Sequence, residues 1–161
     1  MYTEKQRQAV IARAIEAAQA HIDGHTSITL GKGHAAQTFD LVTGGYCERF
    51  VRMCFETALG LAPMTWPYRT AQASQAEAAY GAATRVSLDE LQAGDILVMA
   101  SGQEGHTAIY LHTLYDKAKD LVAENTLSTH RGMPAGKGTK ISSLHDEEAQ
   151  HAWTHAYRLF V

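Results

Sequence analysis

The hydrophobic periodicity of this chain changes once along its length, and this change limits the possible folds more than any other feature. Before Gly94, apolar residues recur at steps of three and four, which is typical of amphipathic helices. After Gly94, the pattern becomes strand-like and is interrupted by turns that contain glycine or charged residues. Helices followed by antiparallel strands predict an α+β fold, in which N-terminal helices pack on an antiparallel sheet of about five strands.

Two long helices have recognisable ends. The first is expected over 3–22, where Thr3 and Gln6 have the spacing of a capping box. The second is expected over 47–59, because its apolar residues follow the helical template and Gly60 stands where a C-terminal cap belongs. The other expected elements are a loop over 28–45 with a short strand at 28–30, a short helix over 71–80, a one-turn segment over 87–91, and strands over 95–100, 106–112, 121–125, 139–142 and 152–161.

Size and composition narrow the class of protein. The chain has 161 residues, of which 45% are hydrophobic, and this is enough to bury one core, so we expect a single domain over 1–161. With 14 Lys and Arg against 17 Asp and Glu, the chain has no basic excess for a nucleic-acid partner. No apolar stretch approaches the roughly 20 residues of a membrane span. Residues 1–6 lack the apolar core of a secretory signal, so we expect synthesis in the cytoplasm.

The two cysteines are expected to have different roles and not to form a disulfide. If Cys47 and Cys54 share one helix, their Cα atoms lie roughly 10 Å apart, beyond the roughly 7 Å limit for a disulfide. Cys54 falls on the apolar face in mid-helix, where a core residue is expected. The histidines show no strong metal spacing. His151 and His155 would share one face of a helix, but their neighbours favour a strand, so no metal or cofactor is expected.

Cys47 is the predicted nucleophile. A cysteine attacks as its thiolate, and nearby positive charge is needed to populate the thiolate at neutral pH. Cys47 occupies the first turn of the helix expected over 47–59 and directly follows Gly44-Gly45-Tyr46. The partial positive charge and free N–H groups of a helix N-terminus stabilise a thiolate, and they can also bind the oxyanion of a tetrahedral intermediate. Tyr46 either hydrogen-bonds near this oxyanion or covers the start of the helix.

His106 is the predicted general base. It opens the strand over 106–112, directly after a Gly-Gln-Glu-Gly turn, and a rigid strand end can hold an imidazole against a helix end. A third group has to orient the ring, and the next strand ends with Glu124 and Asn125. Neighbouring strand residues point to opposite faces, so at most one of the two is expected to face the imidazole. We expect Asn125 in this role first and Glu124 second.

Three sequence blocks carry this predicted nucleophile and base in a fixed order. They are Gly-Tyr-Cys-Glu-Arg-Phe-Val-Arg at 45–52, Ser-Leu-Asp-Glu-Leu-Gln-Ala-Gly-Asp-Ile-Leu at 87–97, and Gly-His-Thr-Ala-Ile-Tyr-Leu at 105–111. In order and approximate spacing they resemble the blocks of the NlpC-type and CHAP-type cysteine peptidases. The sequence departs from these families at Tyr46, where many members carry Asp or Gln, and at the end of the 121–125 strand, where His is common in the NlpC group.

The resemblance implies a papain-like fold and a thiol amidohydrolase that cleaves peptidoglycan at an amide bond in or next to the stem peptide. Cys47 would attack the carbonyl, His106 would pass the thiol proton to the leaving amine, and no cofactor would be needed. The expected settings are phage lysis, as for an endolysin, a phage tail, or an effector delivered by a secretion machine. The sequence identifies no delivery or immunity partner. Two alternatives remain open: a catalytically silent papain-like binding module, and a thiol acyltransferase or deamidase that acts on a protein.

Overall fold

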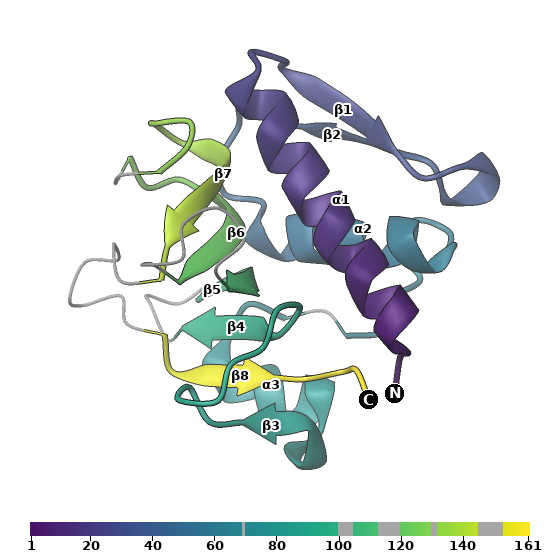
Figure 1. Cartoon of the computed structure of the whole chain (residues 1–161), viewed down its shortest axis with the longest axis vertical. Coiled ribbons are helices and arrows are strands. Elements are labelled where there is room, and N and C mark those ends of the chain that lie inside the picture. The colour runs from purple at the N-terminus through teal and green to yellow at the C-terminus, as the bar shows by residue number, and fades with distance from the viewer. Residues whose placement is uncertain (69, 100–104, 113–119, 130–131, 145–152) are drawn as a thin grey trace.

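The chain folds into three α-helices and two antiparallel sheets within the part that the structure describes. This computed structural model describes residues 1–68, 70–99, 105–112, 120–129, 132–144 and 153–161. Helices α1 (Glu4–Ile22) and α2 (Cys47–Leu59) pack against each other and against the larger sheet, while α3 (Ala73–Tyr80) packs against strands at the other end of that sheet (Figure 1). The predicted α+β class is confirmed.

Both long helices have the ends that the sequence predicts. Thr3 and Gln6 form the capping box of α1: each backbone N–H donates to the other side chain, at 2.8 Å from Thr3 and 3.2 Å from Gln6. Helix α2 begins at Cys47 and ends at Leu59, and Gly60 after it adopts the left-handed conformation of a C-terminal cap. The expected nucleophile therefore stands at the first residue of a well-defined helix.

The segment over 28–45 was expected to be a loop with one short strand, and this prediction is wrong in part. The structure contains a hairpin of β1 (Ser27–Leu30) and β2 (Gln37–Asp40), joined through a 3-10 turn over Gly33–Ala35. Each strand buries only one residue, Leu30 in β1 and Phe39 in β2. Strands this short, with a single buried position each, do not produce a recognisable alternation in sequence.

Among the described residues, the larger sheet has six strands rather than about five, in the order β3-β8-β4-β5-β6-β7. The strand missing from the prediction, β3 (Arg85–Val86), contains only two residues and pairs with β8 (His155–Tyr157). The other strands are β4 (Ile96–Met99), β5 (His106–His112), β6 (Leu121–Thr126) and β7 (Gly138–Ser143). All neighbouring strands are antiparallel.

The larger sheet is buried on both faces, so a polar side chain of this sheet is enclosed on whichever face it occupies. On the helix side, Ile109, Leu111 and Ala123 belong to the main core that α1 and α2 complete. On the opposite side, Ala108 and Val122 belong to a second cluster. Because side chains alternate along a strand, adjacent polar residues of β6 lie on different faces of the sheet.

The chain termini lie side by side in Figure 1, where Tyr2 and Phe160 form a parallel bridge. Within the described residues, no helix combines the length and the apolar character that crossing a bilayer requires.

Candidate active site

Cys47 lies at the N-terminus of α2 and is partly buried. Tyr46 occupies the N-cap position, and no side chain within the described residues caps the helix there. The first hydrogen bond of this helix runs from Phe50 N–H to Tyr46 O. The N–H groups of the first turn thus have no intrahelical acceptor. Together with the helix dipole, they create a positive environment around the thiol.

The turn that precedes Cys47 is packed tightly against the end of β6. Gly44 is buried, and a Cβ atom at this position would overlap with the carbonyl oxygen of Thr126. Gly45 has a φ of +90°, in the left-handed region, and lies against the side chain of Leu127. Only glycine meets both requirements without strain, so the Gly-Gly pair fixes the path by which the chain enters α2.

His106 is the first residue of β5, and Gly105 determines how it is presented. Gly105 has a φ of +68°, and a Cβ atom there would overlap with the carbonyl oxygen of Ala71, just before α3. The imidazole ring stacks against Trp153, with 5.6 Å between the ring centroids and 27° between the planes. Residues 102–104 of the predicted turn lie outside the described residues.

Glu124 holds the imidazole. His106 Nε2 lies 2.8 Å from Glu124 Oε1, and the carboxylate is fully buried. Both residues lie on the face of the sheet that carries Ala108 and Val122. Because Nε2 is engaged by Glu124, Nδ1 is the ring nitrogen that remains to face the thiol.

Asn125 does not contact the imidazole, which corrects the order of preference drawn from the sequence. Its side chain is fully buried on the opposite face, where Oδ1 accepts a hydrogen bond of 2.8 Å from Tyr46 N–H. The physical reason is register: β6 pairs with β5 through Ile109 and Ala123, which brings Glu124 to the face that His106 occupies. As predicted, only one of the two adjacent residues faces the ring.

The electrostatic surroundings of His106 favour a charged ring. Burial disfavours the imidazolium and lowers its pKa, but the hydrogen-bonding and electrostatic interactions of the ring with Cys47 and Glu124 outweigh this effect. The net result raises the pKa of His106 from 6.5 to about 10. At neutral pH the ring of His106 is therefore positively charged.

Two aromatic residues near the site were not recognised in the sequence. Trp153, only 8% exposed, covers one side of the His106 ring. Tyr80 ends α3 and interacts electrostatically with Cys47; burial, followed by the charges of Glu48, Tyr157 and Cys47, raises its pKa, so its hydroxyl remains a donor. Tertiary packing brings both residues to the site, and no spacing in the sequence connects them with Cys47 or His106.

Tyr46 was expected near the oxyanion or over the start of the helix. The residue is 44% exposed, and the Arg49 guanidinium carbon lies 6.0 Å from the centroid of its ring. The backbone N–H of Tyr46 already donates to Asn125 Oδ1, so this N–H is not available to donate to an oxyanion. The N–H groups that remain for an oxyanion are those of the first turn, beginning with Cys47.

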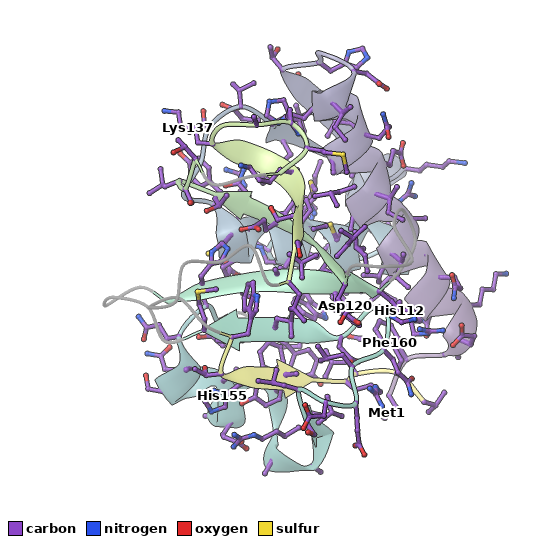
Figure 2. The ribbon with its side chains drawn as sticks, turned by 60° about the vertical axis from the view of Figure 1, so that its left-hand side comes forward. Met1, His112, Asp120, Lys137, His155 and Phe160 are labelled. Atoms are coloured by element: carbon purple, nitrogen blue, oxygen red, sulfur yellow. The ribbon has the colours of Figure 1, made fainter. Side chains whose placement is uncertain are left out.

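Two of the other histidines with assigned positions also belong to the larger sheet. Figure 2 shows His112 beside Asp120, at the end of β5 opposite to His106, with 4.0 Å between His112 Nδ1 and Asp120 Oδ1. His155 belongs to β8, while His151 lies outside the described residues. Within the described part of the chain, no group of three His, Cys, Asp or Glu side chains is arranged for a metal ion. Cys54 is fully buried and free, as expected of a core residue.

The sequence was also compared with known proteins. It matches the sequence model of the NlpC/P60 family over residues 30–158. The chain belongs to this family. The comparison with curated proteins gives no match.

Membership of the NlpC/P60 family confirms the NlpC-type resemblance and agrees with the papain-like α+β fold. The matched region contains Cys47, His106 and Glu124. NlpC/P60 proteins are cysteine peptidases and amidases, which supports a hydrolase at the level of the family, with peptidoglycan as the substrate it suggests. The CHAP-type resemblance and the single domain over 1–161 stay predictions.

Proposed function

We propose that this NlpC/P60 protein hydrolyses an amide bond in or next to the stem peptide of peptidoglycan, with Cys47 as the nucleophile. The observation that carries the proposal is the series Cys47–His106–Glu124. In it, the imidazole lies 2.8 Å from a buried carboxylate and interacts electrostatically with the thiol, which stands at an uncapped helix N-terminus.

Each residue of the series has a distinct part in the first half of the reaction. Cys47 Sγ forms a bond with the carbonyl carbon of the amide, and the carbonyl oxygen becomes an oxyanion. First-turn N–H groups of α2 donate to this oxyanion. His106 then transfers its proton to the amide nitrogen, the C–N bond breaks, and the amine leaves as a thioester forms on Cys47.

The second half of the reaction regenerates the enzyme. His106, now neutral, accepts a proton from a water molecule, and the hydroxide attacks the thioester carbonyl. The C–S bond breaks, the carboxylic acid product leaves, and the thiolate and imidazolium are restored. Glu124 keeps the ring oriented in both halves, because its Oε1 lies at 2.8 Å from Nε2.

Mass spectrometry of purified peptidoglycan tests the proposal. Walls with different stem peptides and cross-links are incubated with the wild type and with Cys47→Ala. We expect new fragments from the wild type only, and their masses identify the cleaved bond. The proposal is wrong if the folded wild type releases no fragment from any wall, or if Cys47→Ala releases the same fragments.

The same proposal requires the protein to reach the cell wall after synthesis, through phage lysis, a phage tail or specialised secretion of an effector. Expression with an added export signal imitates this delivery. Exported wild type should lyse a susceptible bacterium, whereas exported Cys47→Ala should not. Equal survival of both strains would contradict an action on the wall. If the wild type releases no fragment from peptidoglycan but modifies a protein, the result would instead favour an acyltransferase or a deamidase.

A further inference from the structure

Both the oxygen and the nitrogen of the Asn125 side-chain amide form hydrogen bonds within the protein. Oδ1 accepts from Tyr46 N–H at 2.8 Å, while Nδ2 donates to the carbonyl oxygen of Thr43 at 2.9 Å and to Thr139 Oγ1 at 3.2 Å. The side chain is fully buried. A buried amide with these three partners has a single orientation, since any rotation would leave polar atoms unpaired.

Two of these hydrogen bonds go to the segment that leads into α2. Thr43 and Tyr46 stand on either side of the Gly44-Gly45 pair, so the Asn125 amide connects the two ends of this turn. Tyr46 is followed directly by Cys47. The position of the nucleophile thus depends on an amide that comes from the sheet rather than from the helix.

The residue before Asn125 on the same strand holds the base. Glu124 engages His106 on one face of β6, and Asn125 engages the Thr43–Tyr46 segment on the other face. Consecutive Cα atoms are about 3.8 Å apart, a separation fixed by covalent geometry. One peptide unit therefore determines the relative placement of the imidazole and of the chain that carries the thiol.

We propose that Asn125 is a positioning residue for Cys47, which sets the thiol and the first-turn N–H groups of α2 relative to His106. The proposal rests on Cys47 being the nucleophile of the proposed function. A displacement of about 1 Å between reacting groups can reduce a rate by about 100-fold, so the loss of this connection should appear in the chemical step. Substrate binding should change little, because the buried side chain of Asn125 cannot contact the substrate.

The test compares Asn125→Ala and Asn125→Asp with Thr139→Val. Asn125→Ala removes the three hydrogen bonds, whereas Asn125→Asp keeps the acceptor for Tyr46 N–H and loses the donor to Thr43. Thr139→Val removes a bond of the same side chain but neither of the bonds to the Thr43–Tyr46 segment. Iodoacetamide modification of Cys47 is followed by mass spectrometry at neutral pH, and kcat and KM are measured on peptidoglycan fragments. Cys54 is the internal control for folding, because it stays unmodified while it is buried.

We expect Asn125→Ala to reduce both the alkylation rate and kcat by about 10- to 100-fold, with KM nearly unchanged. The alkylation rate and kcat should fall less in Asn125→Asp, and in Thr139→Val both should stay close to the wild-type values. If Asn125→Ala exposes Cys54, the comparison is made with Asn125→Asp. Wild-type alkylation and turnover in the folded Asn125 variants would overturn the proposal, as would an equal loss in Thr139→Val. Alkylation requires no peptidoglycan, so a wild type that is inactive on walls but shows the expected alkylation pattern would refute the proposed function alone.

Discussion

The proposed nucleophile, Cys47, and the proposed base, His106, are positioned by different kinds of interaction. Cys47 stands at the start of a helix that its own sequence specifies, two residues after a Gly-Gly pair that fixes the path of the chain. His106 begins a strand, but its ring is held by residues distant in the sequence, namely Glu124 and Trp153. The comparison teaches that a nucleophile can be encoded locally, whereas the charge state of its base depends on strand register and tertiary packing.

The largest effect is expected on the nucleophile side. Cys47→Ala removes the atom that forms the bond with the substrate, so turnover of peptidoglycan fragments should fall by about 10⁴-fold or more. The thermal unfolding midpoint should change little, because Cys47 is only partly buried. Substantial residual turnover in this variant would show that another group carries the reaction.

On the base side, Glu124→Gln should reduce kcat by about 10²- to 10⁴-fold, because the ring loses the negative partner that orients it. The same change removes a charge that raises the pKa of His106, so the alkaline limit of activity should move to lower pH. Steady-state kinetics between pH 6 and pH 11 measure both effects. An unchanged pH profile would mean that Glu124 does not control the charge of the ring.

The charged ring of His106 should also make the free energy of unfolding depend on pH. The pKa of His106 is about 10 in the folded protein, against about 6.5 in an unfolded chain. The stabilisation from the charged ring is therefore complete below about pH 6.5 and declines as pH rises, until it is lost above about pH 10. Its slope is at most about 1.4 kcal/mol per pH unit, because one proton is involved.

Urea unfolding of the wild type and of His106→Gln over this pH range checks that prediction. The difference between their free energies of unfolding should shrink as pH rises from 6.5 to 10. A difference that is constant with pH would contradict the charged ring.

A smaller effect is expected from the backbone beside the base. Gly105→Ala should destabilise the protein by about 2 kcal/mol, because alanine is strained at a φ of +68° and its Cβ would overlap with the Ala71 carbonyl oxygen. Gly24→Ala is the matched control: Gly24 has a φ of +90° but no atom within 4 Å of the added Cβ. Chemical unfolding should show a loss of about 1 kcal/mol for this control. Equal losses would indicate that the contact with Ala71 is not important.

The same contrast between local and tertiary interactions explains which elements of the fold could be predicted from the sequence. The capping box of α1, the exact span of α2 and the strand that begins at His106 could be predicted, because each follows from a pattern of neighbouring residues. The short strands β2 and β3 could not, since four and two residues do not establish a periodicity.

The site shows the same division. Sequence reasoning proposed Cys47, His106 and the pair Glu124 and Asn125, and it predicted that at most one of the pair would face the ring. It could not choose between them, because the choice depends on the pairing of Ile109 with Ala123. Residues 113–120, which connect these two strands in the sequence, contain charged residues but no glycine, proline or asparagine that would specify a turn type and so the register.

The most direct test of the account is an NMR titration of the His106 imidazole in the wild type, in Cys47→Ala and in Glu124→Gln. The account predicts a wild-type midpoint near pH 10 and a lower midpoint in each variant, because each removes a partner that raises the pKa of the ring. A wild-type midpoint near 6.5, or one that neither variant changes, would contradict a charged imidazole held between the thiol and the carboxylate.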